Sequence, residues 1–158
     1  MPQPAHVSSD LVAVAWIATV TDLTADGVGT QLPPQDTTWS ANGYIVVPVT
    51  VGGSPHSTMP VRRPVCQVEC WATIPGSGIP PWNRAADLAE QIRIATYDRL
   101  NFGRMLAITE NGVVYPAAMC RSARILTEPR QIWGDVADYA GYSFDLALQW
   151  IQVGETIA

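Results

Sequence analysis

The residues best suited to chemistry in this 158-residue chain are two histidines, three cysteines and a few glycine-rich turns. His6 and His56 have no cysteine or carboxylate at the spacing of metal ligands, and no Cys-x-x-Cys pattern occurs. The Gly-Ser-Gly run at 76–78 lacks the wider pattern of a nucleophile elbow, and the glycines at 52–53 lack the Lys-Ser/Thr of a phosphate loop. The sequence therefore predicts no catalytic residue, no metal site and no cofactor, and we do not expect an enzyme.

Two acidic residues, Glu69 and Asp145, fall on predicted strands and could face each other across them. Carboxylates that share a site raise one another's pKa, which is the arrangement that a hydrolase would need. Separate carboxylates on a solvated strand face are the simpler interpretation. A small cytoplasmic enzyme therefore stays a remote alternative.

The three cysteines are Cys66, Cys70 and Cys120. Cys66 and Cys70 lie four residues apart on one predicted strand, which separates them by about 13 Å at the rise of an extended chain. That distance excludes a disulfide between them. The pattern favours reduced thiols that pack as small apolar residues, with a bridge from either one to Cys120 as the alternative.

The charge pattern is unusual, because all nine cations are arginine, the net charge is −5 and the pI is near 4.8. The absence of lysine indicates either a genome rich in G and C or a use of arginine for planar interface contacts. A protein that grips DNA phosphates needs clustered cations, so we expect DNA to pass this chain without tight binding. No apolar run reaches the roughly 20 residues of a membrane span, and the N-terminus lacks a signal-peptide pattern, so we expect synthesis in a cytoplasm and no membrane partner.

Six tryptophans are the other unusual feature, and three of them fall in segments predicted to be loops rich in proline and glycine. Such rings either fold back over the core of their own domain or anchor contacts between proteins, where tryptophan and arginine dominate the binding energy. The candidate subunit-interface residues are Trp39, Arg62, Arg63, Trp82, Arg130 and Trp133.

Length and composition predict one α+β domain over residues 1–158, with a flexible arm at 1–7. We expect a mostly antiparallel sheet with long loops, packed by an N-terminal helix at about 9–20 and one long helix at about 83–101. The first helix is apolar on nearly all sides, and the second has an apolar stripe of helical period that ends near Asn101 and Gly103.

The predicted strands lie at 28–32, 44–51, 65–72, 105–109, 113–126 and 139–153. Asn111-Gly112 is a hairpin-turn pair, and the prolines at 48 and 116 mark sheet edges or bulges. On the strand at 65–72, alternation directs Cys66, Val68, Cys70 and Ala72 to the core. Residues 128–135, which include Trp133, are predicted to be a loop.

A family resemblance rests on the early helix Asp10–Val20, the strand Pro64–Ala72 (PVCQVECWA), the helix Ala85–Arg93 (AADLAEQIR) and the closing strands. In this order, over residues 8–153, these elements resemble the tail terminator proteins of long-tailed, siphovirus-type bacteriophages, particularly those of actinobacterial hosts. The resemblance carries no catalytic motif, and the loop at 52–63 has no matched counterpart.

The resemblance implies a structural protein of the virion neck, assembled in the host cytoplasm as a homohexameric ring that caps the tail tube. The implied partners are further copies of the chain, the tail tube protein, the head–tail connector protein and the double-stranded DNA that passes through the lumen. The alternatives are another neck component, such as a head-completion protein, and a minor tail or tube subunit.

Overall fold

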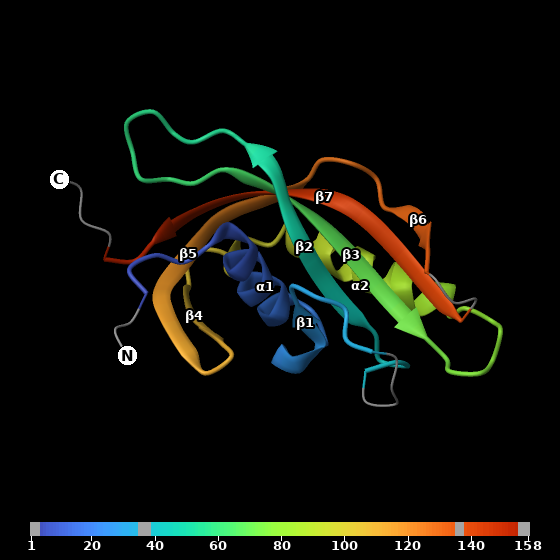
Figure 1. Cartoon of the computed structure of the whole chain (residues 1–158). Helices are drawn as coiled ribbons and strands as arrows, with labels where there is room; N and C mark the ends of the chain where they lie inside the picture. The colour runs from blue at the N-terminus through green and yellow to red at the C-terminus, as the bar shows by residue number, and fades with distance from the viewer. Residues whose placement is uncertain (1–3, 35–38, 135–137, 155–158) are drawn as a thin grey trace.

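The computed structural model describes residues 4–34, 39–134 and 138–154 as a curled sheet with two α-helices (Figure 1). The helices are α1 (Ser9–Val20) and α2 (Trp82–Ala95), and short 3-10 turns occur at Ala25–Gly27 and Arg99–Asn101. The strands are β1 (Val28–Gly29), β2 (Tyr44–Gly53), β3 (Pro64–Thr73), β4 (Met105–Glu110), β5 (Val113–Ile125), β6 (Arg130–Trp133) and β7 (Tyr139–Gln152). This arrangement fits the α+β class that the sequence predicts.

The long strand β7 is the centre of the sheet. The strand order is β1-β2-β3-β7-β5-β4, and β6 pairs with β7 beside the end of β5. The β1–β2 pairing is parallel, whereas the other pairings among the described strands are antiparallel. The sheet curls so that its two edge strands, β1 and β4, both contact α1 (Figure 1).

Both helices contribute to one core on one face of the sheet. Trp16 and Ile17 of α1 and Leu88 and Ile92 of α2 are fully buried in a single cluster with the inward residues of the strands. The four β3 residues predicted to face this core, Cys66, Val68, Cys70 and Ala72, are each 0% exposed. A 12-residue helix is marginal on its own, so α1 owes its stability to this packing.

The second helix is shorter than predicted. It ends at Ala95, whose carbonyl oxygen accepts a hydrogen bond from the Asn101 side chain at 3.0 Å. Asp98 then adopts an extended backbone, and its carboxylate caps the separate turn at Leu100 N–H. The predicted stripe therefore breaks, and Tyr97 and Leu100 are 75% and 79% exposed instead of buried.

The loop predicted at 128–135 contains a strand instead, because β6 pairs with the first half of β7, placing Ile132 opposite Gly141 and Trp133 opposite Ala140. Gly141 permits this pairing, since a Cβ there would lie 2.6 Å from the Trp71 ring and 2.8 Å from Ile132. A four-residue strand with the sequence RQIW carries too little alternation to be recognised from sequence.

The turn and bulge predictions are confirmed. The β2–β3 register shifts between Val46 and Val49, where Pro48 lies, and the β4–β5 register shifts near Pro116. Asn111 and Gly112 both have positive φ, 51° and 77°, as a tight hairpin turn requires. The strand predicted at 28–32 is reduced to the two residues of β1.

The described part of the predicted arm lies along β7. Val7 is 5% exposed, and its N–H donates to the Gln152 side chain, which in turn donates to the Ala5 carbonyl oxygen at 3.0 Å. Residues 1–3 lie outside the described residues, so the flexibility of the arm stays a prediction. No described helix has the length and apolar character needed to cross a membrane.

Candidate subunit interface

Trp82 and Trp133 form an aromatic pair at one end of the molecule. Their ring centroids are 4.9 Å apart at an interplanar angle of 79°, and Trp82 also meets the Tyr142 ring edge-on at 6.0 Å. Trp82 begins α2 and is half-buried, whereas Trp133 at the end of β6 is 74% exposed. An exposed tryptophan held against a second one has the properties of a binding hot spot.

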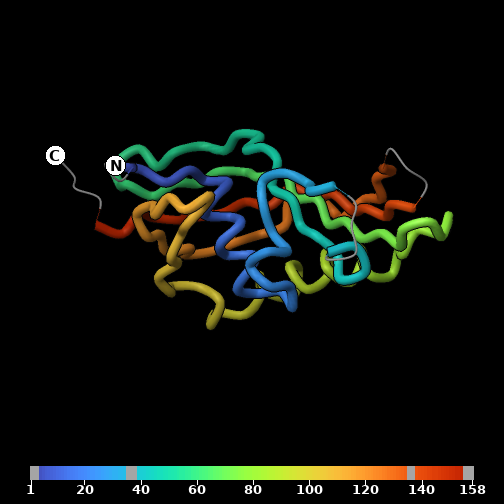
Figure 2. Tube along the Cα trace, turned by 60° about the horizontal axis from the view of Figure 1, so that its bottom comes forward, coloured from blue at the N-terminus to red at the C-terminus, as the bar shows by residue number. Residues whose placement is uncertain are grey.

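The loop at 74–81 reaches the same end of the molecule, opposite the end with residues 4 and 154 (Figures 1 and 2). Asp138 holds this loop, because its carboxylate oxygens accept hydrogen bonds from Gly76 N–H at 2.9 Å and Gly78 N–H at 2.7 Å. The held loop presents Ile79, which is 73% exposed. Ile79, Trp82 and Trp133 are named the aromatic end below.

Trp39 has little surface left for another subunit. It is 6% exposed, its indole N–H donates to the Pro34 carbonyl oxygen at 2.8 Å, and its ring packs on Tyr44 and Tyr139. This small cluster, which also contains Trp71, covers one end of the sheet on the face away from the helices. The arrangement matches the alternative in which a loop tryptophan folds over its own domain.

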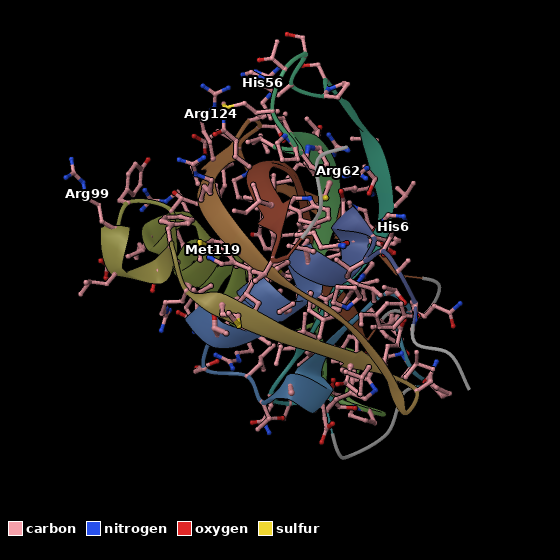
Figure 3. All side chains as sticks on the ribbon, turned by 90° about the vertical axis from the view of Figure 1, so that its left-hand side faces the viewer. His6, His56, Arg62, Arg99, Met119 and Arg124 are labelled. Carbon is pink, nitrogen blue, oxygen red and sulfur yellow. The ribbon has the colours of Figure 1, made fainter. Side chains whose placement is uncertain are left out.

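Arg62 and Arg63 belong to a projecting β-hairpin, residues 49–63, which we name the β2–β3 arm. The Arg62 guanidinium lies 5.7 Å from the centre of the Trp150 ring, and the two residues exchange backbone hydrogen bonds. Arg63 donates to the carbonyl oxygens of Ser54 and Pro55, which braces the arm. Figure 3 shows His56 near the tip of the arm and Arg62 near its base.

Arg130 is exposed on β6. Residues three apart on a strand point to opposite faces, so Arg130 and Trp133 lie on opposite faces of the sheet. The six predicted residues therefore occupy separate places: two arginines on the arm, two tryptophans at the aromatic end, Arg130 on the face away from the helices, and Trp39 inside its own cluster.

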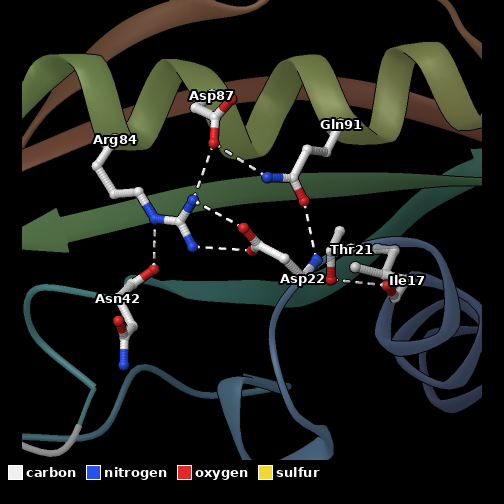
Figure 4. Close-up of polar contacts among 7 residues, drawn as sticks. All are labelled: Ile17, Thr21, Asp22, Asn42, Arg84, Asp87 and Gln91. Atoms are coloured by element: carbon white, nitrogen blue, oxygen red, sulfur yellow. Dashed lines mark hydrogen bonds and ion pairs between the residues drawn. The ribbon is translucent and has the colours of Figure 1, made fainter.

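A polar network outside this prediction joins three segments of the chain (Figure 4). Arg84 on α2 donates to both carboxylate oxygens of Asp22, to Asp87 and to the Asn42 carbonyl oxygen. The hydrogen bond from Arg84 lowers the pKa of the Asp22 carboxyl below 3.8, and the same contact raises the pKa of Arg84. These contacts attach α2 to the segments after α1 and before β2.

The three cysteines are free and buried. Burial raises the pKa of Cys66 to about 11 and that of Cys120 to about 12, and it raises the pKa of Cys70 as well. Thiols with such pKa values are poor nucleophiles at neutral pH. The alternative of a disulfide to Cys120 is therefore wrong for this structure.

The acidic pair considered from sequence is not formed across strands. Glu69 lies opposite Ser143, and its carboxylate accepts hydrogen bonds from the Gln67 amide and the Trp71 indole. Asp145 lies opposite Gln67. Within the described ranges, no group of three His, Cys, Asp or Glu side chains is placed to hold a metal ion.

Exposed apolar side chains also occur where sequence reasoning expected none. Ile94, Tyr97, Leu100 and Met105 are between 58% and 79% exposed. Ile94 does not lie on the apolar stripe of α2. This position is the one sequence signal that could have predicted its exposure. Tyr97 and Leu100 belong to the apolar stripe predicted for the helix at 83–101, and Met105 is the first residue of the strand predicted at 105–109.

Comparison with known proteins gives no family. No family model matches the chain, and no curated protein matches it. A chain of a solved structure described as "Virion of native gene transfer agent (GTA) particle" is similar at a TM-score of 0.47 and 12% identity, over 91% of this chain and 86% of that chain. A second solved chain has a TM-score of 0.36 and 18% identity over 96% of this chain and 100% of its own length. Both TM-scores are below 0.5, so neither likeness assigns a family to this chain.

Proposed function

We propose that the chain is a structural virion protein, a tail terminator that forms a hexameric ring capping the tail tube and joining it to the head-side connector. The proposal combines the resemblance of the element order with the physical character of the surface. The observation that carries it is the exposure of large apolar side chains at separate places, above all Trp133, Tyr97 and Leu100.

A ring needs two different surfaces on each subunit, because its contact is head-to-tail. The aromatic end and the exposed residues beyond α2 lie at opposite ends of a 14-residue helix, which spans about 21 Å at 1.5 Å per residue. Two separated apolar surfaces suit a head-to-tail contact better than a two-fold one, which uses a single self-complementary surface.

The net charge suits a channel for DNA. Six copies of charge −5 carry −30 together, so a ring of them repels phosphate rather than binding it. The same repulsion acts between subunits, so apolar and arginine contacts must overcome it over about 800 Å² on each partner. The proposal assigns no catalytic role to any residue.

Native mass spectrometry of the purified chain, followed by electron microscopy with polymerising tube protein, tests this function. We expect hexamers that bind the ends of tubes and stop their growth. Rings that bind no tube end would point to another neck component, and continuous stacking into tubes would point to a tube subunit. A chain that stays monomeric with and without tube protein would contradict the proposal.

A further inference from the structure

An apolar groove runs between α1 and the two edge strands of the curled sheet. It has a volume of about 490 Å³ and is lined by Val14, Ala15 and Ala18 of α1, by Val28 of β1, and by Leu106 and Ile108 of β4. In the described part of the chain β4 pairs with β5 on one side alone, so its other edge presents free backbone N–H and C=O groups to this groove.

The helix that forms the floor of the groove has no polar face. Apart from Asp10, the residues of α1 are apolar or small, and such a helix is normally covered on every side. Leu11, Val12, Ala13, Trp16 and Ile17 are buried, whereas Val14, Ala15 and Ala18 on the groove side are only partly covered. A further layer over this side would complete the burial of α1.

The β2–β3 arm exposes apolar side chains and an unpaired strand edge that could cover such a groove. Its first strand carries Val49 and Val51, which are 45% and 51% exposed, and Met59 follows at 50%. Because β1 pairs with β2 only at Ile45 and Val46, the outer edge of β2 is free beyond that point. A two-stranded ribbon is marginally stable in water, so this arm gains most from an added strand.

The charges of the two features are complementary. The arm contains Arg62 and Arg63 and no acidic residue, and no acid occurs anywhere between Asp36 and Glu69. Among the residues that line the groove, Glu110 at the end of β4 is the charged one, and none of them is a cation. The arm leaves the body at the top of Figures 1 and 3, whereas β1 and much of β4 lie toward the bottom, so a neighbour is the natural partner.

We propose that the free edge of β2 in the arm of one copy pairs with the free edge of β4 in the next copy, laying the arm over the groove beside α1. The occupant of the groove is thus a second copy of this chain. The contact is head-to-tail and joins the sheets of neighbouring subunits into one. The inference rests on the proposed ring and adds a strand pairing between neighbouring copies to the contact that the aromatic end and the residues beyond α2 make.

Cysteine cross-linking tests the contact. Val51→Cys and Ala107→Cys place one thiol on the arm and one on the edge of β4, both at exposed positions, and the native thiols are buried. The two variants are mixed, treated with a short bis-maleimide and separated by denaturing electrophoresis. Glu90→Cys, at an exposed position in the middle of α2 and between the apolar surfaces at its two ends, replaces Ala107→Cys in the control mixture.

We expect cross-linked dimers in the Val51→Cys and Ala107→Cys mixture at several times the control yield, and none from either variant alone. A second variant, Val51→Glu, should keep its far-ultraviolet circular dichroism and shift the assembly to monomers. Linking of Val51→Cys to itself would show a two-fold contact and overturn the inference.

The two proposals fail in different ways. Hexamers by native mass spectrometry without the mixed cross-link would overturn the arm contact and leave the terminator function standing. Mixed cross-links in assemblies that form no ring and cap no tube would support the arm contact and overturn the terminator function. A wild-type chain that is monomeric at every concentration would overturn both.

Discussion

The Arg84 guanidinium and the Asp22 carboxylate, 62 residues apart in sequence, meet at 2.8 Å and fasten α2 to the segment that follows α1. The Arg84 side chain is 24% exposed and also donates to the Asn42 carbonyl oxygen at 2.7 Å. One side chain therefore connects three segments that no sheet hydrogen bond joins directly.

Replacing Arg84 with alanine should destabilise the fold, because the Asn42 carbonyl and both carboxylates lose their shared donor. We expect the free energy of unfolding to fall by about 1–2 kcal/mol. This is less than the loss of a buried ion pair would cost, because Asp22 is solvated. Urea unfolding at pH 7 measures it. Arg93→Ala is the matched control, since Arg93 contacts Glu90 and the Tyr97 ring, both within four residues of it, joins no distant segment and should cost less. Equal losses for the two variants would contradict a connecting role for Arg84.

The same pair predicts a pH dependence. Arg84 holds the folded pKa of Asp22 below the ordinary 3.8, so the folded state binds fewer protons there than the unfolded state. The stabilisation is complete above the unfolded pKa and disappears as pH falls through the lowered folded pKa. Wild type should therefore lose more stability than Asp22→Asn between pH 6 and pH 3, measured by urea midpoints. Parallel curves for both proteins would show that the contact contributes nothing.

Trp133→Ala should weaken the association of subunits and leave the folding of each subunit nearly unchanged. The ring is 74% exposed, so its removal should change the free energy of unfolding of the subunit by only about 0.5 kcal/mol. At an interface hot spot the same truncation should weaken association by about 2 kcal/mol or more. Sedimentation velocity and thermal melts measure the two quantities. Unchanged assembly would exclude Trp133 from the interface.

Trp82→Ala provides the comparison for that experiment. Trp82 is half-buried and contacts both Trp133 and Tyr142, so its loss should destabilise the subunit itself by about 2 kcal/mol. If Trp82→Ala lowered association while leaving the melting temperature unchanged, the packing described here for its ring would be wrong.

Asp138→Ala should release the loop at 74–81. Its carboxylate is the acceptor for two backbone donors, Gly76 N–H and Gly78 N–H, and is 8% exposed. Loss of the acceptor should cost about 1–3 kcal/mol and speed hydrogen exchange in this loop. Exchange mass spectrometry of the loop peptide measures it, with the β4–β5 hairpin peptide as an internal control. Unchanged protection in the loop would show that Asp138 does not hold it.

The thiols should resist modification in the native protein. Cys66, Cys70 and Cys120 are buried with raised pKa values, so few thiolates exist at pH 8. An aromatic disulfide reagent should label none of them until denaturant is added, after which three equivalents react. Rapid labelling of the folded protein would mean that the strands around β3 open readily.

The sequence predicts the parts of this fold whose local patterns agree with their surroundings. The alternation at 65–72, the apolar helix at 9–20 and the Asn111-Gly112 turn each specify one structure, and each is found. The predicted end of α2 is wrong. Tyr97 and Leu100 continue the helical period, but the Asp98 carboxylate and the Asn101 side chain form hydrogen bonds with nearby backbone groups, and these bonds stop the helix. A local hydrogen bond prevailed over a periodic pattern.

The candidate interface was less predictable, because the exposure of a loop tryptophan depends on distant residues. Trp39 and Trp133 both fall in segments predicted to be loops, yet Trp39 is covered by Tyr44 and Tyr139, whereas Trp133 ends a strand at the surface. The Asp138 clamp joins residues about 60 positions apart, which no local pattern reveals. The contact between neighbouring copies stays a prediction.

The central position of β7 has a consequence for synthesis in the cell. The Trp150 indole donates to the Ser9 hydroxyl at 3.0 Å, and Val7 bonds to Gln152, so the beginning of the chain docks on its last described strand. β3 and β5 can each pair with β7 only after β7 has been synthesised. The β3–β7 pairing joins segments far apart in sequence, and such pairings form slowly. During translation, α1 with its partly covered apolar side and the edge of β3 that pairs with β7 therefore emerge from the ribosome long before β7, which makes the nascent chain a natural client for chaperones.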